Sequence, residues 1–328
     1  MRTERKLSIV IPVYNEEGAL RPLYDALIRG MDNCAGLGIG DFEIWFVSDG
    51  STDGSEAIIR TLIRDDSRVK LIAFRSNFGK ATALQAGFRR VEGDIIVTMD
   101  ADLQDDPSEI RDMVEKLDEG FDMVSGWKVN RQDPLEKRLP SKLFNGVTAA
   151  LSGVKLHDFN CGFKAYRKEV VDGIDVYGEL HRYIPVLASR KGFRIAEIPV
   201  TNHKREFGKS KYGAERYLRG LFDSLTTSFL LRYYDRPMHF FGKIGLFLLI
   251  AGIVICGALT AEWFMGHSIG GRPLLILGIL CVILGVQSIS TGFIGDLIVD
   301  ATFKNRSDES SIREIVVSER APAEGEGA

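Results

Sequence analysis

Two aspartates, Asp100 and Asp102, carry the strongest chemical signal in the sequence. They follow the apolar segment 94–99, which has the composition of a buried β-strand, so both carboxylates belong at the end of a strand. Carboxylates at this spacing can hold one hard cation, since Mg²⁺ in proteins is bound by one or two carboxylates together with substrate phosphates. Gln104 offers a further oxygen. A solvated acidic turn is the competing interpretation of the same residues.

Asp49 marks a second acidic strand end, because it follows the apolar segment 42–48. In the functional interpretation its carboxylate accepts hydrogen bonds from a nucleobase or a ribose. In the structural one, Ser51 or Thr52 caps the helix that follows. The first apolar segment, 7–13, leads into an aromatic ring and acids that suit the edge of a base: Tyr14, Glu16 and Glu17.

Several classes of protein are disfavoured by what the sequence lacks. No G-x-G-x-x-G follows the first apolar segment, and Gly79-Lys80-Ala81-Thr82 lacks the upstream glycine of a P-loop, which argues against dehydrogenases and P-loop NTPases. The net charge of −3 argues against nucleic-acid binding through overall charge. The four cysteines form no C-x-x-C pair, which favours a reducing compartment over a disulfide framework or a structural zinc site.

An α/β domain must position these strand ends. Apolar, β-rich segments alternate with helical patterns, which predicts a mainly parallel sheet covered on both faces, with ligands at the carboxyl ends of its strands. The predicted strands are 7–13, 42–48, 69–74, 94–99, 121–126 and 193–200. The helical patterns are 16–31, 53–64, 80–90 and 107–119.

Two apolar segments, about 244–264 and 273–295, are long enough to cross a bilayer, which needs about 20 residues. They predict a transmembrane hairpin within 238–300 in preference to two buried core helices. Lysines and arginines flank the pair, whereas the loop between the helices holds only Arg272. We therefore expect a multi-pass protein of the inner (cytoplasmic) membrane, with its catalytic domain and both termini in the cytoplasm.

The rest of the chain divides around this hairpin. A catalytic domain is predicted over 1–211, followed by a basic amphipathic helix over 212–237 that lies in the membrane surface. Segment 135–151 has a similar basic amphipathic pattern, and for it the membrane surface and packing against the sheet remain alternatives. The polar tail, 304–328, is predicted to be disordered in the cytoplasm.

Three segments, taken in order, resemble glycosyltransferase family 2: Ile9-Val10-Ile11-Pro12-Val13-Tyr14-Asn15-Glu16-Glu17, Asp49-Gly50-Ser51-Thr52-Asp53 and Asp100-Ala101-Asp102-Leu103-Gln104. The resemblance covers about 1–235 and implies the inverting GT-A fold, a Rossmann-like α/β architecture. Together with the hairpin, the D-A-D-L-Q form resembles polyprenyl-phosphate glycosyltransferases, including dolichyl-phosphate mannose synthases. It implies a nucleotide-sugar donor, Mg²⁺ or Mn²⁺ as cofactor, and a polyprenyl phosphate acceptor in the lipid bilayer.

The same resemblance implies roles for individual residues. It assigns nucleoside binding to Pro12, Tyr14, Glu16 and Asp49. It assigns the metal and diphosphate site to Asp100, Asp102 and Gln104. The acid near the sugar and the acceptor is Asp158, which we expect to be catalytic together with Asp102. A basic loop that closes over the donor contains Arg205, Ser210 and Lys211. The acceptor phosphate is assigned to Arg138, Ser141 and Lys128, although at Lys128 family members often have an arginine.

The chemistry of the acceptor agrees with these roles. A lipid monophosphate has a second pKa of about 6, so it is largely dianionic at neutral pH and needs cations rather than a general base. Asp158 is therefore expected to orient the acceptor or the sugar. The expected reaction is transfer of one sugar, with a UDP-sugar favoured as donor, to undecaprenyl phosphate at the cytoplasmic face of the membrane.

Two other functions are weighed against this one. A processive polysaccharide synthase usually carries a Q-x-x-R-W segment and more membrane helices, and the sequence has no Q-x-x-R-W. A non-catalytic membrane scaffold with a degenerate domain is disfavoured by the intact pair Asp100 and Asp102. No nucleic-acid partner is expected, and a homo-oligomer stays open.

The predicted topology can be tested at the loop between the two apolar segments. In Ser268→Cys, a membrane-impermeant thiol reagent should label the protein in intact cells, because the charge bias places this loop outside the cytoplasm. A cysteine introduced into the tail is the matched control and should react only after lysis. Labelling of Ser268→Cys only after lysis would contradict the orientation.

Overall fold

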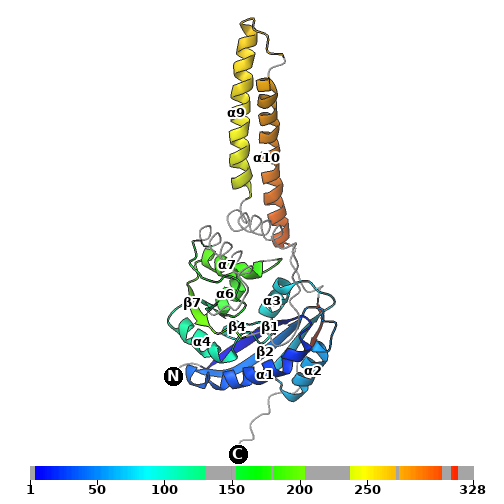
Figure 1. Ribbon diagram of the computed structural model, residues 1–328, viewed down its shortest axis with the longest axis vertical. Coiled ribbons are helices and arrows are strands. Elements are labelled where there is room, and N and C mark those ends of the chain that lie inside the picture. Colours follow the sequence, from blue (N-terminus) through cyan, green and yellow to red (C-terminus); the bar gives the residue numbers. More distant parts are fainter. Residues whose placement is uncertain are drawn as a thin grey trace, which may run out of the picture. The chain divides into compact units, whose positions relative to one another are not determined.

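The computed structural model describes residues 4–129, 149, 153–178, 180–203, 237–270, 273–304 and 312–316. The chain forms two compact units, of which one comprises Met1–Tyr217 with Asp308–Ala328 and the other comprises Leu218–Ser307. The first unit is built on an eight-stranded sheet with the strand order β7-β5-β6-β4-β1-β2-β3-β8. Figure 1 shows this sheet between two layers of helices.

The sheet is mainly parallel, as the sequence predicts. Parallel pairs join β1 to β2, β1 to β4, β2 to β3 and β5 to β7. The strands in these pairs are β1 (Arg5–Val13), β2 (Ile39–Ser48), β3 (Val69–Phe74), β4 (Ile95–Thr98), β5 (Met123–Lys128) and β7 (Ile195–Val200). All six lie at the predicted positions, because each is a short apolar run that is buried in a covered sheet.

Alternate residues of β1 face two separate helical layers. Leu7, Ile9 and Ile11 pack in a cluster with α1 (Glu17–Asp32), α2 (Ser55–Asp65) and α4 (Ile110–Asp118). Val10 packs on the opposite face, in a cluster with α3 (Lys80–Phe88), α6 (Lys168–Gly173) and α7 (Ile184–Arg190). Short 3₁₀ helices lie at Ala35–Leu37, Pro107–Glu109 and Leu180–Tyr183. The loops that follow the parallel strands therefore emerge together at the carboxyl edge.

Two antiparallel strands were not predicted. β6 (Lys164–Arg167) lies between β4 and β5 and runs against both. Its sequence, Lys-Ala-Tyr-Arg, is too short and too polar to form an apolar run. Because β6 is reversed, its amino-terminal end lies at the same edge as the carboxyl ends of β4 and β5. The loop that carries Asp158 therefore lies at this edge, beside the predicted site.

The second unpredicted strand corrects the expectation of a disordered tail. Within 304–328, β8 (Ile312–Val316) pairs antiparallel with β3, so Ile315 lies opposite Ile72. The segment is rich in β-branched residues, which favour strands. Without β8, the far edge of β3 would expose unpaired backbone groups. Disorder is therefore wrong for this segment.

The described part of the second unit contains two long helices, α9 (Met238–Phe264) and α10 (Pro273–Lys304). Within the described part of the chain, they are the helices long and apolar enough to cross a membrane. Their outward side chains are exposed, with Phe247 at 72% and Ile276 at 70%, which is the surface expected of lipid-facing helices rather than of core helices. α9 begins six residues before the predicted apolar segment at 244.

Glycines allow α9 and α10 to approach closely. A Cβ at Gly252 would lie 2.7 Å from the backbone nitrogen of Val282, and one at Gly285 would lie 2.7 Å from that of Leu249. Both distances are too short for a side chain, so these positions require glycine. Small residues of this kind are the usual contacts between membrane helices. At the start of α9, the Met238 N–H donates to the Asp296 carboxylate of α10 at 3.1 Å.

The packing of the hairpin predicts different effects at two glycines of α9. Gly252→Ile should separate the helices and destabilise the hairpin by about 1–3 kcal/mol, the usual cost of overpacking. Gly257→Ile is the matched control, because a Cβ there meets nothing within 4 Å. Thermal unfolding in detergent measures both variants. Equal midpoints for the two would contradict the close approach at Gly252.

Candidate functional site

The loops after β1 and β2 are joined by hydrogen bonds. The Thr52 N–H donates to the side-chain oxygen of Asn15 at 2.8 Å, and the Asn15 N–H donates to the Ser51 hydroxyl at 3.2 Å. Asn15 can receive this contact because its φ of 58° turns the chain in the left-handed region. The structure thus brings the predicted nucleoside residues to one edge, where Tyr14 is 39% exposed and Pro12 and Glu16 are half-buried.

Asp49 is buried and holds a neighbouring loop. Its carboxylate accepts the N–H groups of Phe78 at 2.7 Å and of Gly79 at 2.9 Å, just before α3. Burial raises the pKa of Asp49, although these two hydrogen bonds oppose the rise. Gly50 makes the close approach possible, because a Cβ there would lie 2.4 Å from the backbone of Ser76. Asp49 therefore shapes the loop, and its direct contact with a nucleoside stays a prediction.

Lysines surround the carboxylate of Asp100 at the end of β4. Lys80 at the start of α3 places its ammonium 2.5 Å from Asp100 Oδ1, and about one third of each side chain is exposed. Burial alone would raise the pKa of Asp100, but the neighbouring lysines outweigh burial and hold that pKa well below its usual range. The lysines, in order of effect, are Lys80, Lys128 and Lys164. Asp100 is thus an ionised carboxylate.

Asp102 differs electrostatically from Asp100. Burial, together with the charges of Asp100 and Asp105, raises the pKa of Asp102. The Gln104 N–H donates to Asp102 Oδ1 at 3.2 Å, while the Gln104 side-chain amide donates to the His203 carbonyl at 3.4 Å. Gln104 therefore ties this turn to the segment after β7, and its role as a metal ligand stays a prediction.

Asp100 and Asp102 fit a hard divalent cation. Their carboxylates lie two residues apart in a turn, and the residue that follows Asp102, Leu103, has a φ of 60°, a strained conformation of the kind that clusters at functional sites. Oδ1 of Asp100 already attracts a cation, the ammonium of Lys80. Among the described residues, no group of three acidic, His or Cys side chains gathers as a complete metal site. A cation here would need further oxygens from substrate and water, as is usual for Mg²⁺.

The Lys128 side chain is largely buried and forms an ion pair with an acid of the same turn. Its ammonium lies 2.7 Å from Asp105 Oδ1, and its side chain is only 10% exposed. Burial would lower the pKa of Lys128, but the charge of Asp105 outweighs burial and raises it. The Asp100 N–H donates to the other oxygen of Asp105 at 3.4 Å. In this structure Lys128 supports the acidic turn, and its contact with the acceptor phosphate stays a prediction.

Asp158 is almost fully buried, at 3% exposure, in the loop that leads into β6. Its Oδ1 accepts the Asn160 N–H at 3.0 Å. The same loop reaches Asp100, because a Cβ at Gly162 would lie 2.7 Å from Asp100 Oδ2. The structure therefore links the two acids through a single loop.

Four residues near these acids were missed as site residues by sequence reasoning. Lys80, Lys164 and His181 line one small cavity, and Lys164 is buried with its ammonium donating to the Cys161 carbonyl. Burial, with Lys80 and Arg182, lowers the pKa of His181 to about 3, so its ring is neutral at physiological pH. The fourth is Glu197 of β7, which contacts the loop of Asp158. Only Lys80 had a local signal, since it follows a glycine at the start of a predicted helix.

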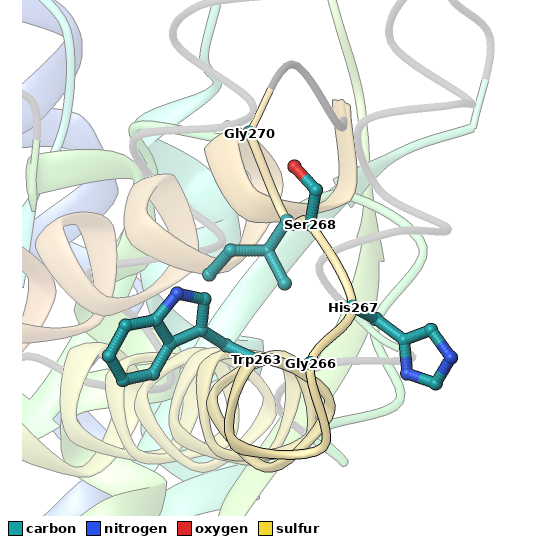
Figure 2. A pocket seen from close by; sticks show the side chains of 6 residues that line it. Trp263, Gly266, His267, Ser268 and Gly270 are labelled. Atoms are coloured by element: carbon teal, nitrogen blue, oxygen red, sulfur yellow. The ribbon is translucent and has the colours of Figure 1, made fainter.

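Some predicted residues lie outside the described part of the chain: Arg138, Ser141, Arg205, Ser210 and Lys211. The amphipathic segments 135–151 and 212–237 lie almost wholly outside it as well. A separate shallow pocket belongs to the hairpin unit, where the end of α9 and the following loop form its walls (Figure 2). Its lining is Trp263, Gly266, His267, Ser268, Ile269 and Gly270, which offers no acidic cluster for metal chemistry.

Comparisons with known proteins agree with this geometry. The model of glycosyl transferase family 2 matches residues 8–174. The dodecaprenyl-phosphate galacturonate synthase of Rhizobium johnstonii is 35% identical over 324 residues, which cover 97% of this chain and 95% of the relative. The undecaprenyl-phosphate 4-deoxy-4-formamido-L-arabinose transferase of Salmonella paratyphi B is 34% identical over 302 residues, which cover 90% of this chain and 88% of the relative.

A solved structure supports the fold. Glucosyl-3-phosphoglycerate synthase from Mycobacterium tuberculosis, in a complex with Mn²⁺, uridine diphosphate and phosphoglyceric acid, superposes with a TM-score of 0.50 at 20% identity. The match covers 68% of this chain and 78% of that one. The GT-A architecture expected from the sequence is confirmed.

The two backbone contacts of Asp49 predict the effect of Asp49→Asn. The amide nitrogen would face one of the two N–H donors, so the loop before α3 should loosen, at a cost of about 1–3 kcal/mol in unfolding free energy. The affinity for nucleotide should fall as this loop loosens. Asp66→Asn is the matched control, because Asp66 is also buried but accepts the Tyr24 hydroxyl at 2.8 Å, in a contact that involves none of the site loops. Thermal unfolding and calorimetric titration with nucleotide distinguish the variants. Unchanged affinity in Asp49→Asn would contradict a role in the donor site.

Proposed function

Because the chain belongs to glycosyl transferase family 2 and is a glycosyltransferase, we propose that it transfers a single sugar from a nucleotide-sugar to polyprenyl phosphate. The two relatives named above act, by their names, on dodecaprenyl and undecaprenyl phosphate, and each aligns with at least 90% of this chain. Their names support a polyprenyl phosphate acceptor. A UDP-sugar is the proposed donor.

The observation that carries the proposal is the charge arrangement at Asp100. Acids and lysines meet at the carboxyl edge of the sheet, where ligands of α/β proteins bind. In a single displacement, an oxygen of the acceptor phosphate forms a bond to the anomeric carbon while the bond to the nucleoside diphosphate breaks. This displacement inverts the anomeric configuration. Negative charge then grows on the leaving diphosphate, and fixed cations stabilise it.

Residues of this chain have distinct roles in the proposed reaction. Asp100 and Asp102 would hold Mg²⁺ or Mn²⁺, which neutralises charge on the diphosphate when bound. Lys80, half-buried and paired to Asp100, is close enough to the same site to bind a diphosphate oxygen. Arg205, Ser210 and Lys211 are proposed to close over the donor, with Arg138 and Ser141 on the acceptor phosphate.

Asp158 is proposed to orient the reactants rather than to remove a proton. The acceptor phosphate is already largely dianionic at neutral pH, since its second pKa is about 6. A buried carboxylate with a fixed backbone contact at 3.0 Å is suited to positioning. This role is compatible with its location in the loop that also contacts Asp100.

The hairpin is proposed to anchor the enzyme in the inner membrane. Two apolar helices with exposed outer faces suit a lipid environment, and the acceptor's long chain is itself confined to a bilayer. We propose that the catalytic domain and both termini face the cytoplasm, where nucleotide-sugars are made available.

A donor screen tests the function. The full-length protein in detergent is given undecaprenyl phosphate, Mg²⁺ or Mn²⁺, and one of several donors, including UDP-glucose, UDP-glucuronate, UDP-galacturonate, UDP-N-acetylglucosamine and GDP-mannose. Mass spectrometry should find a lipid product heavier by one sugar residue. Products with many sugars would support the processive alternative, and no product with any donor would count against the proposal.

Asp102→Asn should lower transfer at least about a hundredfold while the fold remains, because one charged ligand of the diphosphate site is lost. EDTA treatment of the wild type should have the same effect. Asp118→Asn is the matched control, since Asp118 forms an ion pair with Arg5 at the opposite edge of the sheet. Full activity in EDTA would rule out the metal.

A further inference from the structure

Glu197 of β7 makes an unusual set of contacts with the loop before β6. Its Oε1 accepts the N–H groups of His157 and Asp158, each at 3.0 Å. Its Oε2 accepts the same His157 N–H at 2.9 Å and lies 2.8 Å from His157 Nδ1. The Glu197 side chain is only 10% exposed. One carboxylate thus receives two consecutive backbone donors and a ring nitrogen.

We propose that Glu197 is a positioning residue for sugar transfer, which acts by fixing the backbone of Asp158. This inference rests on the proposed function, in which Asp158 orients the reactants. Glu197 does not act as a base, because both of its oxygens already accept hydrogen bonds from the loop. Its effect on the reaction passes through the loop from 157 to 162.

The loop needs an external partner because it has no regular structure of its own. Asp158 lies in a turn closed by its own carboxylate, which accepts the Asn160 N–H. Farther along, the Thr98 hydroxyl donates to the Gly162 carbonyl at 2.9 Å, which fixes the other end of the loop to β4. Glu197 is the corresponding support at the start, so the loop is held from both ends.

The position of Glu197 in the sheet makes this support rigid. β7 pairs in parallel with β5, and Glu197 lies opposite Ser125 in that register. Two residues along β5, the Trp127 ring stacks on the His157 ring at 4.0 Å with an interplanar angle of 14°. Neighbouring strands therefore hold His157 by its backbone, its ring nitrogen and its ring face.

The same loop carries Asp158 and packs against Asp100, so loss of its support affects more than local stability. Gly162 packs directly against the Asp100 carboxylate, where a Cβ would lie 2.7 Å from Oδ2. A loop that shifts at Asp158 therefore alters the position of Asp158 relative to Asp100. Misplacement of a reacting group by about 1 Å can cost a hundredfold in rate.

Substitutions at Glu197 separate hydrogen-bond geometry from charge. In Glu197→Gln, a carbonyl oxygen in the place of Oε1 still accepts both backbone N–H groups, although the charge is gone. In Glu197→Ala, both N–H groups lose their acceptor. We expect kcat to fall by about ten- to a hundredfold in Glu197→Ala and by less than about threefold in Glu197→Gln. KM for the nucleotide-sugar should change little in either variant.

Two controls identify a merely structural effect. Glu43→Gln alters another buried, multiply bonded carboxylate, which accepts the Ser8 hydroxyl at 2.6 Å and the Glu92 N–H at 2.9 Å. It should lower the unfolding temperature and leave kcat per folded molecule unchanged. In an Asp158→Asn background, Glu197→Ala should cause little further loss of kcat, because both residues act as one unit.

Hydrogen exchange of the full-length protein supplies a readout that does not depend on activity. The amides of His157 and Asp158 should exchange faster in Glu197→Ala than in the wild type, with little change in Glu197→Gln or Glu43→Gln. Unchanged exchange in Glu197→Ala, or a normal kcat in that variant, would overturn the proposal. Equal loss of kcat in Glu197→Gln and Glu197→Ala would also overturn it, since charge would then be the requirement. A wild type that transfers no sugar would count against the proposed function, and the exchange result would still decide the positioning role.

Discussion

The carboxylate of Asp100 must be balanced by positive charge, and much of the first unit is arranged around that requirement. An ionised group at the end of a buried strand is costly unless it is paired. Three elements each supply a lysine: Lys80 from the start of α3, Lys128 from the end of β5 and Lys164 from the start of β6. Asp105 in turn neutralises Lys128 at 2.7 Å. The result is a cluster of acids and lysines in which the lysines hold the pKa of Asp100 below its usual range.

This cluster suits phosphate chemistry because it offers charges of both signs within one small region. The acids can hold a divalent cation, and Lys80 is exposed enough to meet an incoming anion. Lys128 and Lys164 are buried, so they influence the site through the effect of their charges on the Asp100 carboxylate. A transferase needs both kinds of charge, since the donor diphosphate must be bound and the charge that grows on it must be stabilised as the sugar leaves.

The reversed strand β6 connects this charge cluster to Asp158. In a fully parallel sheet, the chain before a strand would lie at the amino edge, far from the other functional loops. The antiparallel direction of β6 instead brings residues 157–162 between the carboxyl ends of β4 and β5. Glu197 and Trp127, on the two strands beyond, then hold that loop in place. In the hairpin unit, glycine contacts such as that of Gly252 with Val282 allow the two helices to pack closely, as membrane helices do.

Local patterns in the sequence were enough for the six parallel-paired strands, the pair of apolar helices and the carboxylates at strand ends, because burial and short-range spacing set these features residue by residue. Long-range pairing was not readable in this way. The resemblance assigned Lys128 to the acceptor phosphate, and no local pattern indicated its ion pair with Asp105, 23 positions earlier in the chain. Glu197 and His157 are 40 positions apart, and β8 meets β3 across most of the chain. Such contacts depend on which strands become neighbours and in which direction they run, and that choice minimises the free energy of the whole sheet rather than of any one segment.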